Sequence, residues 1–278
     1  MNEFGGVLFE APAPMDRLVA RGLAVAISTI FAFAAPFAWI PLVRIPMFIP
    51  LYESAVVIND LVTAAVFAAL FAIRGSRGLL FLAAGYLWTA LSAVAHLLSF
   101  PGFLTPTGLW AGPQTTARLY VVWHIGFPAA VILYAVGGRP LIRSRARALL
   151  IAGLAVAVTV AGLFVLSTSG RGLLPPIMDS DRESAWARLT ASDICLVAAL
   201  AMSCVLVKGP CGGRTRLDLW LSVAAYAWIG DFALSAVFNA GRFDVGFYAG
   251  RFFGFLAVSF VLYQMLLLAV VEHYRHAR

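Results

Sequence analysis

The feature that most constrains this chain is a series of long apolar segments separated by short stretches rich in Pro, Gly and Arg. An α-helix needs about 20 apolar residues to cross the hydrocarbon layer of a bilayer. Eight segments of that length are present, at about 17–39, 51–73, 78–100, 116–137, 148–168, 187–207, 217–238 and 248–271. Because they lack the alternation of barrel strands, the sequence predicts an all-α integral membrane protein with eight transmembrane helices.

Composition supports this prediction. Of the 278 residues, 62% are hydrophobic and only 12% are charged, which excludes a soluble globular enzyme and a disordered chain. The net charge of +7 arises mostly in the short connecting segments, where the topology of a membrane protein explains it better than nucleic-acid binding does. We therefore predict the lipid bilayer, and no nucleic acid, as a partner.

The distribution of Lys and Arg predicts how the chain is oriented. An even number of spans places both ends on one side, and 13 of the 20 Lys and Arg residues fall on that side. Basic residues concentrate in cytoplasmic loops, so both termini are predicted to be cytoplasmic. The predicted organisation is a cytoplasmic tail at 1–16, an eight-helix membrane domain at 17–271 and a second cytoplasmic tail at 272–278.

Short similarities indicate an internal repeat. The motif GLAVA occurs at 22–26 and again at 153–157. Asp60 in the second span corresponds to Asp193 in the sixth, and Arg118 at the start of the fourth span corresponds to Arg251 at the start of the eighth. Two parallel four-helix repeats would explain these matches, and chance similarity between apolar helices is the alternative.

Ionisable and amide side chains inside the spans gather toward the predicted outer ends. Such groups are costly in a bilayer, so each is a candidate functional residue. The simplest interpretation is a polar ligand-binding cavity that opens outward, and the alternative is a set of polar contacts that hold the helices together. The predicted residues are Glu53, Asn59, Asp60, His96, Arg118, His124, Asp193, Asp231, Arg242 and Arg251. The uncharged loop at 101–115 could cover such a cavity, although an anchor of Trp110 at the membrane interface is the simpler explanation of its composition.

His96 and His124 lie at similar predicted depth on adjacent antiparallel spans. Neutral imidazole is a ligand for haem iron and transition metals, so the pair could bind haem b or a metal. Hydrogen-bonded core histidines and pH-sensitive groups are the other possibilities. The sequence has no phosphate-binding glycine loop, no HExxH helix and no GxSxG turn, so we predict that the chain is not an enzyme.

Two stretches carry a family resemblance: HLLSFPGFLTPTGLWAGPQTTARLYVVWHIGFPAAVILYA at 96–135 and WIGDFALSAVFNAGRFDVGFYAGRFFGFLAVSFVL at 228–262. Together they resemble the type-four membrane-associated sensor domain of bacteria, and the resemblance extends over about 17–271. It implies a multi-pass sensor of the bacterial inner membrane, usually followed by a diguanylate cyclase or histidine kinase. The residues that it marks are His96, Pro101, Gly102, Pro113, Gln114, Thr115, Trp123, His124, Gly126, Pro128, Asp231, Arg242, Tyr248, Gly250 and Arg251.

The resulting hypothesis is a sensory or regulatory membrane domain that reads a ligand or a redox signal in the outward cavity. About seven residues follow the eighth predicted span, so either the chain is a stand-alone relative or its output domain is not part of this sequence. A solitary sensor needs a membrane or cytosolic signalling partner, or a second copy of itself, to pass on the signal. The alternatives are a haem- or quinone-binding electron-transfer subunit, a transporter, and a structural subunit of a larger membrane complex.

Overall fold

The computed structural model describes residues 4–112, 114–137, 141–170, 173–179, 182–184, 189–194, 197–199 and 215–276. In this part of the chain almost all regular structure is helical. The helices are α1 (Phe4–Leu8), α2 (Pro14–Ala34), α3 (Phe48–Arg74), α4 (Arg77–Ser99), α5 (Thr115–Val136), α6 (Arg145–Ser169), α8 (Arg216–Phe232) and α9 (Val245–His276). The short elements are a 3₁₀ turn η1 (Ala35–Phe37), a π-helical segment η2 (Ala233–Phe238), and the paired strands β1 (Met178–Asp179) and β2 (Arg182–Glu183).

Seven of these helices are long and apolar enough to cross a membrane: α2 with η1, α3, α4, α5, α6, α8 with η2, and α9 as far as Val271. The prediction of an all-α integral membrane protein is therefore confirmed. The span predicted at 187–207 lies partly outside the described residues, and helical residues within it are 189–194 and 197–199. An eighth membrane-spanning helix thus stays a prediction.

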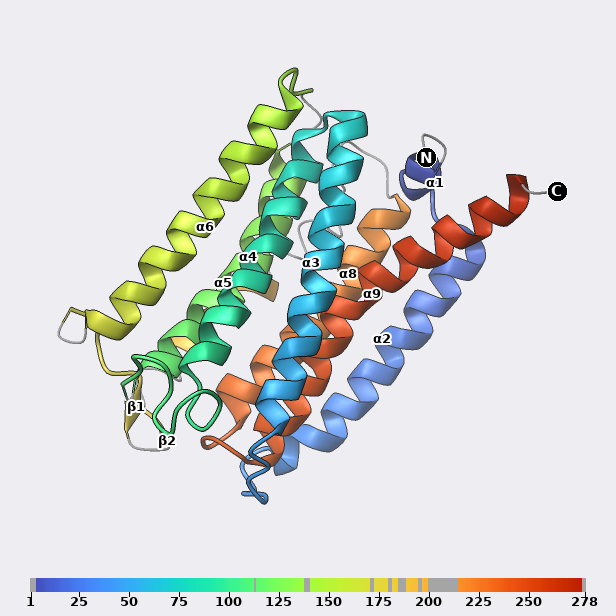
Figure 1. Cartoon of the computed structure of the whole chain (residues 1–278). Coiled ribbons are helices and arrows are strands. Elements are labelled where there is room, and N and C mark those ends of the chain that lie inside the picture. Colours follow the sequence, from blue (N-terminus) through green and yellow to red (C-terminus); the bar gives the residue numbers. More distant parts are fainter. Residues whose placement is uncertain are drawn as a thin grey trace.

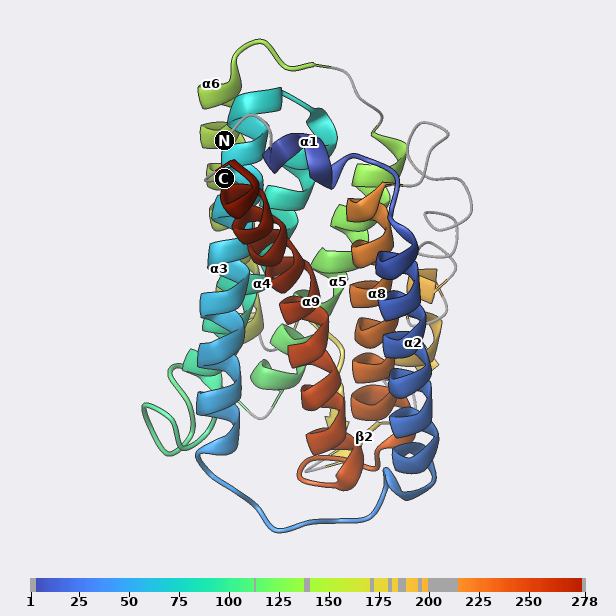
Figure 2. The ribbon, with the colours of Figure 1, turned by 90° about the vertical axis from the view of Figure 1, so that its right-hand side faces the viewer.

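The helices form one bundle with both chain ends at the same end of it (Figure 1). Helices α3, α4 and α5 pack in sequence order, and α6 covers α4 and α5 on one flank. On the other flank α8 packs against α9 and α2, and α9 also contacts α3 (Figure 2). Strands β1 and β2 lie at the end of the bundle opposite to the termini, which is the predicted outer side.

Burial separates a lipid-facing periphery from an internal core. Large apolar side chains on α2 and α6 are exposed, among them Phe33 and Val158. Helices α4 and α8 are the most buried of the seven. Because lipid tails solvate apolar side chains, the exposed surfaces of α2 and α6 are suited to contact the bilayer.

Two arginines of the predicted cytoplasmic side stabilise helix ends. The last carbonyl groups of a helix lack partners within it. Arg145 donates from Nη1 to the carbonyl oxygens of Ala72 and Ile73 near the end of α3, at 2.7 and 2.8 Å. Arg77 donates from Nε to the carbonyl oxygen of Gly137, just after α5, at 3.0 Å. These residues, predicted only as topology signals, therefore also cap helices.

Helices α4 and α5 approach closely because glycines face their neighbours. A Cβ atom added at Gly126 would lie 1.9 Å from Cδ1 of Trp88. The Trp88 indole passes over this glycine and donates from Nε1 to the carbonyl oxygen of Val122 at 3.0 Å. Any side chain at Gly126 would therefore displace Trp88 and separate the two helices.

We predict that Gly126→Ala lowers the free energy of unfolding by about 1–3 kcal/mol, the usual cost of overpacking a core contact. The matched control is Gly153→Ala on α6, where a Cβ would meet nothing within 4 Å. Alanine favours helix over glycine, so this control should be unchanged or stabilised by up to about 1 kcal/mol. Thermal unfolding of the purified variants in one detergent compares them, and equal midpoints would contradict the close α4–α5 packing.

Candidate functional site

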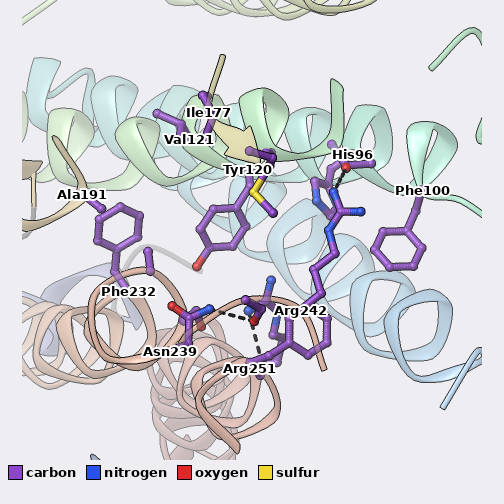
Figure 3. Close-up of a pocket in the computed structure, with 17 residues that line it drawn as sticks. His96, Phe100, Tyr120, Val121, Ile177, Ala191, Phe232, Asn239, Arg242 and Arg251 are labelled. Carbon is purple, nitrogen blue, oxygen red and sulfur yellow. Dashed lines mark hydrogen bonds between the residues drawn. The ribbon is translucent and has the colours of Figure 1, made fainter. Parts of the chain in front are cut away.

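A cavity of about 70 Å³, here called the outer cavity, lies between α4, α5, α8 and α9 toward the predicted outer side. Polar side chains from different elements point into it (Figure 3). These are His96, Tyr120, Asn239, Arg242 and Arg251. Apolar side chains, including Phe232 and Phe247, form the rest of the wall. The cavity thus combines an apolar lining with a cluster of donors.

Arg251 is the most unusual group in the outer cavity. Its side chain is buried, with 7% exposed, and its Nη1 donates to the carbonyl oxygen of Phe247 at 3.3 Å. Its Cζ lies 4.0 Å from the centre of the Phe247 ring and 5.0 Å from that of Tyr120. No carboxylate in the described part of the chain lies within 4 Å of this guanidinium. A buried cation held mainly by aromatic faces is suited to bind an anion.

A second arginine adds positive charge to the same cavity. Arg242 lies in the connection between η2 and α9 and donates from Nη2 to Oγ1 of Thr116 on α5, at 2.6 Å. This hydrogen bond ties the Arg242 guanidinium to α5, on the other side of the cavity from the connection that carries Arg242. The carboxylate of Asp244, two residues later, accepts hydrogen bonds from the backbone N–H groups of Ala240, Gly241 and Phe247. Asp244 therefore fixes the turn that carries Arg242.

Asp244 lies outside the membrane-spanning helices, and its environment affects its ionisation in two directions. Burial raises the pKa of its carboxyl, because the charged form loses solvation. The three backbone N–H donors and the charge of Arg251 act in the opposite direction. The carboxylate is thus committed to the turn rather than directed into the cavity.

An extended segment that includes β1 covers the outer cavity, since Ile177 and Met178 line it. Gln114, just before α5, accepts hydrogen bonds on Oε1 from the backbone N–H groups of both residues, at 2.8 and 2.7 Å, and donates to the carbonyl oxygen of Met178. Arg118 donates to the carbonyl oxygens of Leu174 and Pro175. The side chains of Gln114 and Arg118, at the start of α5, therefore hold this cover in place.

The π-helical segment η2 begins two residues after Asp231, and its Ser235 and Ala236 line the cavity. Its Ser235 donates from Oγ to Oδ1 of Asp231 at 3.0 Å. A Cβ added at Gly250 would lie 1.8 Å from Oγ of Ser235, so only glycine at this position lets α9 pack this closely against η2. Short π-helical segments often occur at functional sites because they shift the register of side chains.

His124 and Asp231 form a buried pair behind the outer cavity. Nδ1 of His124 lies 2.9 Å from the carbonyl oxygen of Tyr120 and therefore carries a hydrogen, since a carbonyl oxygen only accepts. Nε2 lies 3.2 Å from Oδ2 of Asp231. A proton is thus needed between these two atoms, on the imidazole or on the carboxyl.

Glu53 and His96 form a second buried pair at the wall of the outer cavity. Nδ1 of His96 lies 2.7 Å from Oε1 of Glu53, and the side chains are 5% and 1% exposed. The contact joins α3 to α4. His96 faces the cavity, and Glu53 lies behind it.

The structure thus divides the predicted site residues into groups. His96, Arg242 and Arg251 line the outer cavity, with Glu53 behind His96. Asp60, His124 and Asp231 line a smaller cavity deeper in the bundle. The remaining three lie elsewhere: Asn59 donates to Oγ of Ser259, Arg118 holds the covering segment, and Asp193 is exposed. Pro113, which the family resemblance marked, lies outside the described residues.

Sequence reasoning missed the hydroxyl groups of both cavities. Thr116 and Tyr120 line the outer cavity, and Tyr52, Tyr86 and Thr89 line the deeper one. Tyrosine and threonine also occur at ordinary core positions, so the sequence has no signal that separates the two roles. Their depth, close to that of the charged residues, was the available clue.

The arrangement of His96 and His124 does not fit a haem held between them. Both ring nitrogens of His124 face protein acceptors, and Nδ1 of His96 faces Glu53. The outer cavity is also far smaller than the pockets of about 300–1,000 Å³ that enclose larger ligands. In the described residues, no group of three or more His, Cys, Asp or Glu side chains could hold a metal ion.

Fold and site together define a multi-pass helical membrane protein with a buried, positively charged cavity toward one side. Comparison with protein families agrees, because residues 43–274 match the model of the membrane-associated sensor, integral membrane domain (MASE4). The chain therefore belongs to this family of membrane sensor domains, as the sequence resemblance predicted. No curated protein and no solved structure matches the chain.

We predict that Gln114→Ala loosens the cover of the outer cavity. The substitution removes the acceptor of the Ile177 and Met178 N–H groups, so these amides should exchange with deuterium about tenfold faster or more. Hydrogen exchange of the peptides around 173–179 measures this. In the control Thr29→Ala, which removes a hydroxyl bonded only within α2, exchange there should not change. Unchanged exchange in Gln114→Ala would contradict the clamp.

Proposed function

We propose that this chain is the input domain of a bacterial signalling system and that its ligand is a small anion bound in the outer cavity. The buried Arg251 guanidinium is the observation that carries the proposal. A buried charge is costly unless a partner of opposite sign neutralises it. Among the described residues, Arg251 contacts two aromatic rings and one carbonyl oxygen, and the Asp244 carboxylate with which its charge interacts is hydrogen-bonded to the backbone of its own turn. An anion in the cavity would therefore complete the environment of Arg251.

The size and lining of the cavity narrow the ligand class. About 70 Å³ is enough for a few water molecules, an inorganic anion or a short carboxylate. Arg242 adds a second guanidinium, and Asn239 an amide, on the same wall. Two guanidinium groups favour a planar or tetrahedral oxyanion, because each can donate two parallel hydrogen bonds to it.

Helix α9 offers a route from the cavity to the cytoplasmic side. It begins at Val245 beside the cavity, carries Arg251 in its second turn and ends at His276. The distance along the helix from Arg251 to His276 is about 38 Å at 1.5 Å per residue. A shift of Arg251 toward a bound anion would move this helix as a unit. A cytosolic or membrane partner, or a second copy of the chain, would then take up the movement.

The proposal predicts that small anions stabilise the purified protein against heat. In potassium phosphate, nitrate or acetate, the unfolding midpoint should lie about 3 °C above that in potassium gluconate, whose anion is too large for the cavity, once the ligand exceeds its Kd about tenfold. Arg251→Gln should abolish the difference, because it removes the charge. Arg216→Gln is the matched control, since Arg216 pairs with Asp16 far from the cavity and should keep the response.

Equal midpoints in all four potassium salts would contradict the anion site. A response that persists in Arg251→Gln would place the anion elsewhere. If Arg251→Gln does not fold, Arg251→Lys replaces it. Lysine keeps the charge but loses the paired donors, so the half-saturating anion concentration should rise about tenfold.

A second prediction separates a sensor from a static structural subunit. Leu150 on α6 and Val270 on α9 are exposed and lie near the cytoplasmic end. With Cys195, Cys204 and Cys211 replaced by Ala, spin labels at these two positions should change their separation by about 1–2 Å or more when the stabilising anion is added. The same labels in Arg251→Gln should show no change. A separation that stays constant with bound anion would favour the structural subunit.

A further inference from the structure

A second cavity of about 30 Å³, here called the inner cavity, lies deeper in the bundle than the outer one. Asp60 on α3 lines it, 12 residues after the helix begins at Phe48 and 14 before it ends at Arg74. At 1.5 Å per residue Asp60 is about 18 Å along the helix, close to the middle of the bilayer. Neither the outer cavity nor the proposed anion accounts for this residue.

The Asp60 carboxylate has no hydrogen-bond donor among the described residues. Its side chain is 0% exposed, and neither Oδ1 nor Oδ2 accepts a hydrogen bond. The hydroxyl of Thr89 adjoins the carboxylate but donates its hydrogen to the carbonyl oxygen of Tyr86, at 2.9 Å. No Lys, Arg or His in the described part of the chain lies within 4 Å of Asp60. An uncompensated carboxylate at this depth would be very costly.

The neighbouring charged pair does not compensate Asp60. Asp231 faces the same inner cavity, but its two oxygens already contact His124 and Ser235. His124 in turn uses its other nitrogen on the carbonyl oxygen of Tyr120. The contacts of Asp231 and His124 are therefore made within this pair and with Ser235 and Tyr120, and the pair gives Asp60 no counter-charge.

Other oxygen atoms line the same cavity as the Asp60 carboxyl. The Tyr86 hydroxyl is buried without a hydrogen-bond partner in the described structure, and Oγ1 of Thr89 keeps a free lone pair. Gly254 brings the opposite wall close, because a Cβ there would lie 2.6 Å from both the Tyr52 hydroxyl and Oδ2 of Asp231. Hard cations prefer oxygen ligands of this kind. A single proton would form a hydrogen bond between only two of these oxygens. A cation could be coordinated by several of them at once.

We infer that the inner cavity binds a monovalent cation of the size of sodium on Asp60, with the hydroxyls of Thr89 and Tyr86 as further ligands. The void is large enough for one such ion, with or without a water molecule. This site is distinct from the proposed anion site, and each can exist without the other.

Thermal unfolding of the full chain in detergent, at fixed pH and fixed total chloride, tests the inference. Replacing choline chloride by sodium chloride should raise the unfolding midpoint with saturation, by about 3 °C at tenfold excess over the Kd. Potassium chloride should raise it less. Asp60→Asn should abolish the sodium response, because the amide is neutral and nearly isosteric. Asp218→Asn is the matched control, a buried carboxylate at the start of α8 that should keep the sodium response.

A second pair of variants protects the test against misfolding of Asp60→Asn. Thr89→Val and Tyr86→Phe each remove one oxygen and keep the shape of the side chain. Each should raise the half-saturating sodium concentration about tenfold. Equal midpoints in sodium, potassium and choline chloride would overturn the inference and leave protonation as the way Asp60 is neutralised. A sodium response that persists in Asp60→Asn would also overturn it.

Discussion

The bilayer supplies no hydrogen bonds, and the polar structure of this protein follows from that constraint. Each ionisable group within a span must find a partner inside the bundle. Glu53 meets His96, and Asp231 meets His124, both across helix boundaries. These pairs join α3 to α4 and α5 to α8, so they fix helix positions while they neutralise charge. Two groups, Arg251 and Asp60, lack such a partner in the described chain, and each lines a cavity. Ligands of opposite charge would satisfy the same constraint.

The sequence predicted the helical membrane fold and the family, and both predictions are confirmed. The predicted ligand-binding cavity toward the outer side stays a prediction. The sequence could not predict whether each side chain points toward the bundle interior or toward lipid. A helix that packs against other helices on one side and lipid on the other is apolar all round, so its amphipathic pattern is weak. For that reason Arg118, predicted beside a ligand, instead holds the covering segment, and that segment, rather than loop 101–115, lines the cavity. Asp193 was predicted inside and is exposed.

Helix packing bears on the predicted duplication. The predicted first half consists of α2, α3, α4 and α5. The predicted second half begins with α6 and ends with α8 and α9. The first helix of each half packs against the third helix of the other half. This is seen in the contacts of α2 with α8 and of α6 with α4. Reciprocal contacts of this kind are what two parallel copies related by a twofold axis give. The two arginines matched in the sequence have different contacts: Arg118 donates to backbone carbonyls, whereas Arg251 faces the cavity.

The two proposed sites would be coupled, because neighbouring side chains of α5 and α8 separate their cavities. Tyr120 and Phe232 line the outer cavity, while His124 and Asp231, one turn and one residue away, line the inner one. The rings of Tyr120 and His124 lie 3.9 Å apart between centres. In a medium of low dielectric constant, an anion beside Arg251 and a cation on Asp60 would attract each other. Linkage requires that each then raises the affinity for the other by the same factor. Occupancy of the inner cavity by a cation would thus set the affinity of the outer cavity for its anion.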